Sequence, residues 1–228
     1  MNIHITENQH KYLQQFVTRT ETIGSKLYGA DCDKSDTDLL CMYKIKDKSI
    51  LRHLSRLPSI HQFQYKDIEN NIDYIYCTPQ QFFYNQASGD STINSDICLF
   101  SEMSWCGSIE MCRTYKVIKG YLGFAKRDLK QYKEGNHKLI HAKRGLYCVE
   151  KLMNNEPPLI EDIQEFYQME HNVTDLIQLE HNLRFDLTHM LNRNELEFYQ
   201  ISELFDKDDD EYVFQLLLNS NNTKEFKY

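Results

Sequence analysis

Two aspartates separated by one residue stand directly before an apolar run, and this arrangement limits the folds open to the chain more than any other feature. Asp36 and Asp38 are followed at once by the apolar residues 39–42. An extended strand points residues i and i+2 to the same face, so both carboxylates lie on one side of a strand predicted over residues 37–45. Like charges at the start of a buried strand repel each other and lose hydration unless a positive group lies between them. A divalent cation such as Mg²⁺ meets this need, because it prefers oxygen ligands.

A glycine and a serine lie before the carboxylates and suit the same chemistry. Gly24 allows backbone conformations that a Cβ would hinder, and Ser25 adds a hydroxyl group. Together they can present backbone N–H groups and a hydroxyl to a phosphate. The alternative is a Gly-Ser turn followed by an aspartate-rich loop that caps a strand. The joint pattern, with apolar Ile23 before it and the apolar run after it, favours a site for a metal ion and a nucleotide.

The segment with Gly24-Ser25, a spacer and then Asp36-x-Asp38 resembles the signature of the nucleotidyltransferase superfamily that includes DNA polymerase β. It is most similar to a bacterial and phage group of predicted nucleotidyltransferases, some of which are labelled as RNA-repair-associated. The resemblance is specific over residues 23–43 and weak from about residue 155 to the end.

A third carboxylate is expected from the resemblance, because in this superfamily it lies on a later strand of the same sheet. Asp73 is the candidate, within the β-rich run 72–77, where an acidic residue is otherwise out of place. Asp67 and Glu69 are nearby rivals. The resemblance thus implies Asp36, Asp38 and Asp73 as catalytic residues and as ligands of Mg²⁺ or Mn²⁺.

A second cluster of polar residues lies on a predicted helix. Lys138, His141 and Arg144 are each three residues apart, so they share one side of that helix. A triphosphate would be complemented there by the lysine as a point charge and by the arginine as a bidentate clamp. The alternative is an exposed basic face beside the core. This stretch also resembles the same group of nucleotidyltransferases. The resemblance implies that Lys138, His141 and Arg144 bind the nucleotide together with Gly24 and Ser25.

The pattern of elements predicts an α+β fold in two parts. Residues 1–104 would form a small mixed β-sheet with helices, the nucleotidyltransferase domain that the resemblance implies, and residues 105–228 a mostly helical C-terminal domain that supports substrate or nucleotide. We expect a hairpin from residues 60–65 and 72–77, and a helix from Pro79, capped by Thr78, to about Ser88. Further helices are predicted over residues 7–18, 47–57, 109–132, 139–153, 160–169, 173–192, 195–204 and 212–218.

Charge and composition narrow the classes of function. The chain of 228 residues has a net charge of −8, so it is not built to grip long nucleic acid, although a local basic patch could hold an RNA end. Its seven cysteines are scattered, with no Cys-x-x-Cys pair, which predicts reduced thiols. No apolar run reaches about 18 residues and no signal peptide is evident, so we expect a protein of the bacterial or phage-infected cytoplasm without a membrane partner.

The function that these patterns predict is metal-dependent transfer of a nucleoside monophosphate from a nucleoside triphosphate to a hydroxyl group. The expected acceptor is an RNA end, either a tRNA or a repair intermediate. Two alternatives are transfer of AMP to a protein hydroxyl, as antitoxin-like nucleotidyltransferases do, and a non-catalytic nucleotide-binding regulatory module. The oligomeric state stays open.

Overall fold

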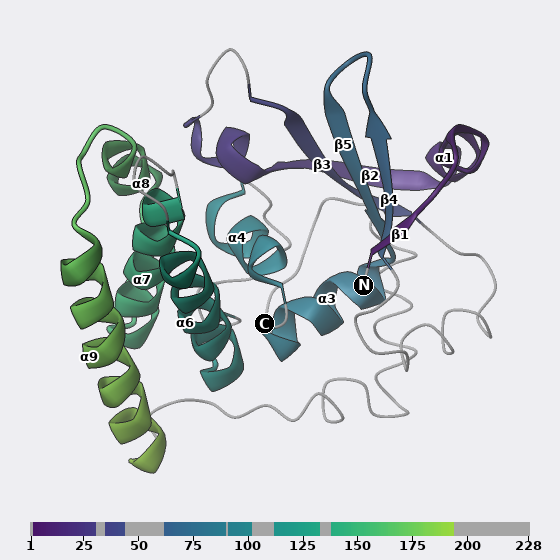
Figure 1. The fold of residues 1–228 in the computed structure, drawn as a ribbon. Helices are drawn as coiled ribbons and strands as arrows, with labels where there is room; N and C mark the ends of the chain where they lie inside the picture. The colour runs from purple at the N-terminus through teal and green to yellow at the C-terminus, as the bar shows by residue number, and fades with distance from the viewer. Residues whose placement is uncertain are drawn as a thin grey trace. The chain divides into compact units, whose positions relative to one another are not determined.

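The structure is a computed structural model that describes residues 2–30, 35–43, 62–89, 91–101, 112–132 and 138–193. Over these residues the fold is α+β, as predicted (Figure 1). The strands are β1 (Asn2–His4), β2 (Val17–Ile23), β3 (Thr37–Tyr43), β4 (Gln62–Asp67) and β5 (Ile72–Cys77). The helices are α1 (Glu7–Gln14), α3 (Pro79–Ser88), α4 (Thr92–Phe100), α6 (Tyr115–Lys130), α7 (Lys138–Met153), α8 (Ile160–Phe166) and α9 (Val173–Asn192), with a 3₁₀ turn, η1 (Gly24–Tyr28).

The described residues divide into two compact units. The first, here called the sheet unit, comprises residues 2–24, 35–43 and 62–85. The second, the helical unit, comprises residues 25–30, 86–89, 91–101, 112–132 and 138–193. The division falls within α3, whereas the sequence analysis placed the change of domain at residue 104.

The described strands of the sheet unit form one mixed five-stranded sheet in the order β1-β4-β5-β3-β2. Strand β3 is parallel to β5 and antiparallel to β2, while the central strand β5 forms the predicted antiparallel hairpin with β4. The hairpin turns at Asn71, whose φ of 54° is in the left-handed region that asparagine tolerates. The sequence analysis missed β1, because three residues are too few to show an alternating pattern.

One face of the sheet is closed by aromatic side chains and α1. Buried Tyr43 and Tyr76 form a core cluster against which Leu13 of α1 packs. His10 of α1 is also buried, with its ring stacked 4.1 Å from that of Tyr65 and its Nδ1 2.8 Å from the Tyr76 hydroxyl. This burial lowers the pKa of His10, which favours the neutral ring among its tyrosine neighbours. The helix and the sheet therefore form one rigid support for the strand ends.

The helical unit is built on α6, α7 and α9, which pack side by side (Figure 1). Their facing sides carry buried apolar residues at helical spacing, as the sequence predicted for α6 and α7. The largest of these fully buried side chains are Ile118, Tyr121, Leu122, Leu146 and Leu152. No helix among the described residues is long and apolar enough to cross a membrane.

Most predicted helices are found, but one was missed and three have different ends. Helix α6 begins at Tyr115, six residues after the predicted start, because Thr114 caps it. The sequence analysis did not predict α4, because Asn94, Ser95 and Asp96 interrupt the apolar pattern, although all three are buried in the structure. Helix α8 ends at Phe166, three residues before the predicted end, and α1 is likewise shorter than predicted. The predicted helices over residues 47–57, 195–204 and 212–218 lie outside the described residues.

The five cysteines in the described part of the chain are all buried and free, in agreement with the predicted reduced thiols. They are Cys41, Cys77, Cys98, Cys112 and Cys148.

Candidate metal centre

The pairing of two strands brings the predicted carboxylates together. In the parallel pair of β3 and β5, Asp38 lies directly opposite Asp73. Asp36 lies two residues before Asp38, so an extended backbone turns the two carboxylates to the same side. The carboxylate oxygens of Asp36, Asp38 and Asp73 come within 4.8 Å of one another, with all three residues partly exposed. The structure therefore assembles the three predicted ligands at one end of β3.

The hairpin adds a lysine that the sequence analysis did not identify. Lys66 lies opposite Asp73 in the pairing of β4 and β5. Its Nζ donates a hydrogen bond of 3.2 Å to Asp73 Oδ2 and lies 3.8 Å from Asp36 Oδ2. The hydrogen bond to Asp73 is the main reason that the pKa of Lys66 is raised. One ammonium group balances at most one of the three negative charges, so the cluster still favours a further cation.

Two observations show that the carboxylates are not fully satisfied by the protein. Burial, with the nearby charges of Asp36 and Asp73, raises the pKa of Asp38 to about 6. Asp73 Oδ1 is buried and has no hydrogen-bond partner among the described residues. A buried carboxylate oxygen without a partner carries a desolvation penalty, and a bound cation would remove it. The donor set is all oxygen, which fits Mg²⁺ or Mn²⁺.

Gly24 lies against the same cluster. Its φ is +70°, and a Cβ built on it would lie 2.6 Å from Asp38 Oδ2. Only glycine therefore combines this backbone conformation with close approach to the carboxylate. Ser25 begins the helical unit, and its carbonyl accepts a hydrogen bond of 3.0 Å from the Ala30 N–H. The phosphate-binding role of its hydroxyl stays a prediction.

The rival acidic residues are placed differently. Asp67 accepts hydrogen bonds from the backbone and the side chain of Asn70, at 3.1 and 2.8 Å, and so stabilises the hairpin turn. These bonds hold the pKa of Asp67 below its usual value. Glu69 is exposed in the same turn. Neither residue belongs to the cluster, so Asp73 is the third carboxylate that the geometry supports.

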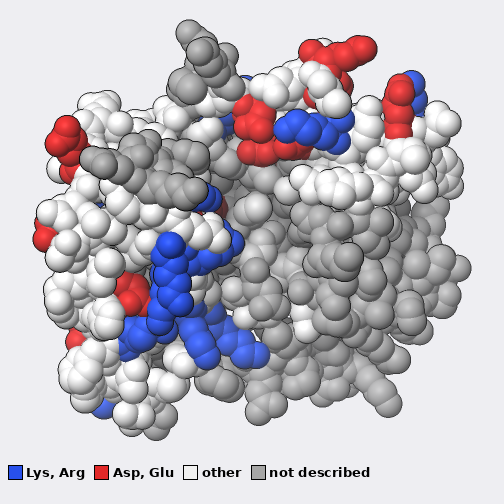
Figure 2. All heavy atoms as spheres, viewed as in Figure 1, with Lys and Arg blue, Asp and Glu red and all other residues white. Residues whose placement is uncertain are grey.

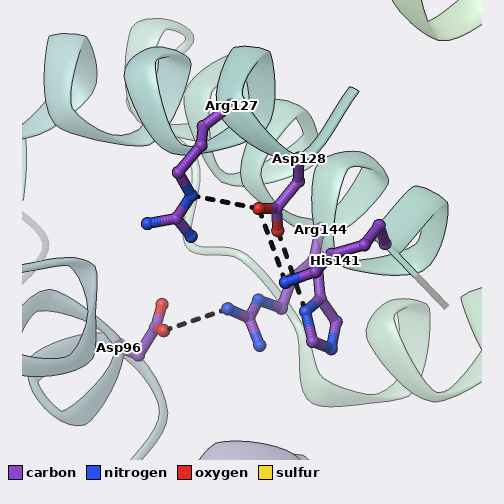
Figure 3. Close-up of polar contacts among 6 residues, drawn as sticks. Asp96, Arg127, Asp128, His141 and Arg144 are labelled. Atoms are coloured by element: carbon purple, nitrogen blue, oxygen red, sulfur yellow. Dashed lines mark hydrogen bonds and ion pairs between the residues drawn. The ribbon is translucent and has the colours of Figure 1, made fainter. Parts of the chain in front are cut away.

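The other predicted nucleotide-binding residues belong to the helical unit. Lys138 and His141 are partly exposed on α7 and face a carboxylate of α6. Lys138 Nζ lies 3.8 Å from Asp128 Oδ1. His141 Nδ1 lies 3.8 Å from Asp128 Oδ2 (Figure 3). Asp128 is fully buried, and Arg127 Nε approaches it to 3.1 Å. Asp128 therefore fixes the two predicted side chains at the α6–α7 contact.

Arg144 lies inside the helical unit rather than on an exposed basic face. Its Nη2 is 3.5 Å from Asp96 Oδ2 (Figure 3). Its guanidinium also lies 4.6 Å from the centre of the Tyr28 ring. Asp96 also accepts a hydrogen bond of 2.6 Å from the Tyr121 hydroxyl. The side chain of Arg144 is 9% exposed, so these contacts hold η1 and α4 against α7. A nucleotide-binding role for Arg144 stays a prediction.

Sequence reasoning missed Lys66, Asp96 and Asp128, and two of them left a signal. The turn between residues 67 and 72 places Lys66 opposite Asp73 once the hairpin is accepted. Asp128 occupies a core position in the apolar pattern of α6, where an acidic residue needs a partner. Asp96 left no such signal, because α4 itself was not predicted.

Comparisons of the chain with protein-family models, with curated proteins and with solved structures found no match.

Proposed function

We propose that this protein is a metal-dependent nucleotidyltransferase that moves a nucleoside monophosphate from a nucleoside triphosphate to a hydroxyl group. The observation that carries the proposal is the convergence of Asp36, Asp38 and Asp73 within 4.8 Å, beside a glycine backbone. Three carboxylates with one lysine form a site for divalent cations that carry phosphates. The sequence resemblance to nucleotidyltransferases supports the same chemistry.

In this proposal the three aspartates hold Mg²⁺ or Mn²⁺. When bound, the metal neutralises phosphate charge and makes the acceptor hydroxyl a better nucleophile. Gly24 leaves room for the Asp38 carboxylate beside the backbone, and Ser25 follows with a hydroxyl donor for a phosphate. The protein then acts mainly by positioning the α-phosphate for in-line attack.

The cations of α7 have different parts in this proposal. The side chains of Lys138 and His141 are each 29% exposed, so their contact with Asp128 leaves part of each open to solvent. Arg144 is engaged by Asp96 and Tyr28 within the helical unit, so it is the weaker candidate for direct contact with a nucleotide. Lys138 and His141 are therefore the stronger candidates for neutralising the leaving pyrophosphate.

An RNA end is the acceptor that we propose, following the sequence resemblance to RNA-repair-associated members. Transfer of AMP to a protein hydroxyl uses the same carboxylates and is the alternative. A non-catalytic nucleotide-binding module is less well supported, because all three carboxylates are present and in register.

The test is transfer of label from each of the four α-³²P nucleoside triphosphates, with Mn²⁺ or Mg²⁺, to pooled small RNAs or to protein. We expect wild-type protein to label RNA and the Asp36→Asn/Asp38→Asn variant to lose at least a hundredfold in rate, in line with the loss of a principal catalytic group. The matched control is Asp67→Asn, which removes a carboxylate from the hairpin that carries Asp73 but not from the cluster.

Each outcome separates the candidates. Label on protein instead of RNA would identify an AMP-transferase, and nucleotide binding without transfer would identify a binding module. Full activity of Asp36→Asn/Asp38→Asn would refute the proposal.

A further inference from the structure

Helix α6 has two faces of opposite character. One face packs into the helical unit, with Val117, Ile118, Tyr121 and Leu122 almost fully buried. The opposite face carries all the basic residues of the helix. They are the half-exposed Lys116 and the exposed Lys119, Lys126, Arg127 and Lys130, which we call the α6 basic stripe.

One member of the stripe is paired on its own helix, because Arg127 Nε lies 3.1 Å from Asp128 Oδ1. Asp128, the one acidic residue of α6, is fully buried and faces Lys138 and His141 of α7. Lys126 and Lys130 have no ion-pair partner in the part of the chain that the structure describes. Figure 2 shows Lys and Arg side chains gathered over α6. Such a concentration is unexpected in a chain with 34 acidic and 26 basic residues.

The stripe also contains a glycine without a packing reason. Gly123 is exposed, and a Cβ built on it would meet nothing within 4 Å. Two other glycines of α6 and α7 are explained by contacts, since a Cβ on Gly120 would lie 2.3 Å from the Gly89 oxygen and one on Gly145 would lie 3.4 Å from Ala125 Cβ. Glycine weakens a helix interior relative to alanine, so an exposed one suggests close approach of another molecule.

We infer that the α6 basic stripe binds the phosphodiester backbone of a nucleic acid strand, with its closest approach at Gly123. The stripe runs from residue 116 to residue 130, which is about 21 Å along a helix and equals the axial rise of roughly six nucleotides in one strand of a duplex. Repeated charges of one sign in a line suit a ligand that repeats one negative group. Since phosphates carry no sequence information, the site should accept RNA and DNA of equal length alike.

Two other partners fit the stripe less well. A helix that lies in a membrane surface presents apolar residues to the lipid, whereas the apolar face of α6 is buried in the helical unit. A protein partner would make apolar contacts as well as charged ones. The stripe offers five cations and a glycine, with no exposed apolar side chain between Lys126 and Lys130, so an acidic protein surface fits it less well.

The test is the fluorescence anisotropy of a labelled RNA of about 12 nucleotides, twice the span of the stripe, in the presence of EDTA. The variant Lys119→Gln/Lys126→Gln/Lys130→Gln should bind at least tenfold more weakly. Its log–log salt dependence should be shallower by about 2, because each phosphate contact to a single strand contributes about 0.7. The matched control Lys11→Gln/Lys151→Gln/Arg193→Gln removes the same charge away from the stripe and should bind like wild type.

Gly123→Gln tests the point of closest approach. This neutral change should raise the thermal midpoint of unfolding, because glutamine is the better helix former, and should weaken RNA binding about threefold or more. A purely structural glycine would give the first effect without the second.

Other outcomes would overturn the inference. Equal binding by the stripe variant and its control would show that the stripe is not the site. Binding of polyglutamate or of phosphatidylserine vesicles as tightly as RNA would assign the surface to a protein or a membrane. The inference rests on the proposed function in one respect only, namely that the bound nucleic acid is the acceptor of the transfer reaction. RNA binding is measured in EDTA, which removes divalent metal. RNA can therefore bind when nucleotide transfer fails, and transfer can occur when RNA does not bind to the stripe.

Discussion

At the scale of single residues, the carboxylates of the candidate centre repel one another. Asp38 lies between Ile23 and Asp73 on neighbouring strands, and its pKa is raised to about 6 by burial and by the two other aspartates. A carboxyl group whose folded pKa is raised binds a proton more tightly in the folded state than in the unfolded one. The contribution of Asp38 to the free energy of unfolding is therefore largest at low pH, and it is lost as the pH rises from about 4 to about 6. Charged functional sites commonly lower the stability of the fold when no ligand is bound.

The first prediction concerns Asp38→Asn in the absence of metal. At pH 7.5 this variant should be more stable than wild type by about 1–2 kcal/mol, since about 1.4 kcal/mol accompanies each pKa unit and solvent screens part of it. The difference should shrink as the pH falls towards 4, where Asp38 of wild type is protonated. Urea unfolding at the two pH values, with EDTA present, measures it. A variant that is less stable than wild type at pH 7.5 would show that Asp38 stabilises the fold.

At the scale of elements, η1 follows β2 directly, and two glycines with different surroundings stand at its first residue and just after its last. Gly24, with φ +70°, lies against Asp38, whereas Gly29, with φ +62°, lies against the flexible end of Gln164. Between them Tyr28 is buried under Arg144, and its carbonyl accepts a hydrogen bond of 2.9 Å from Gln164. The turn is thus fixed by the helical unit, while its first residue shapes the carboxylate cluster.

A matched pair of substitutions follows from this contrast. Gly24→Ala and Gly29→Ala should each lower the free energy of unfolding by about 1–3 kcal/mol, because both place a Cβ on a left-handed residue. Only Gly24→Ala should also reduce Mn²⁺ affinity, by tenfold or more, because its Cβ would displace the Asp38 carboxylate. Urea unfolding and Mn²⁺ titration followed by electron paramagnetic resonance give the two values. Equal Mn²⁺ affinities in the two variants would contradict this role of Gly24.

At the scale of the whole molecule, charge is distributed unevenly. The chain is acidic overall, yet its acidic cluster lies in the sheet unit and its basic stripe lies in the helical unit. Net charge alone therefore describes the binding properties of this protein poorly. A local cluster can bind a cation or a polyanion irrespective of the overall sign.

Metal binding should be visible in the stability of the whole chain. A ligand that binds only the folded state at one hundred times its dissociation constant adds about 2.7 kcal/mol. We expect Mn²⁺ to raise the thermal midpoint of wild type and of Asp67→Asn, and to leave Asp36→Asn/Asp38→Asn unchanged. Differential scanning calorimetry with EDTA or Mn²⁺ measures the shift. An equal shift in all three proteins would place the bound metal elsewhere.

Local sequence determined most of the elements and the pairing of Asp36 with Asp38 on one side of a strand. Thr78 caps α3 through its hydroxyl, which accepts a hydrogen bond of 3.2 Å from the Gln81 N–H, as the Thr-Pro start predicted. The apolar periods of α6, α7 and α9 similarly predicted helices close to those observed. These features depend on neighbours a few residues apart, so one sequence is enough to identify them. Asp73 was predicted by resemblance, and its choice over Asp67 and Glu69 needed the structure.

Only the tertiary structure decided which side chains share an environment. The register of β3 against β5 places Asp38 opposite Asp73, and the hairpin brings Lys66 to the same point. Packing likewise turned Arg144 into the core beside Asp96, although its spacing with Lys138 and His141 predicted a shared basic face. The physical reason is that strand pairing and burial depend on residues far apart in the chain, which no local pattern records.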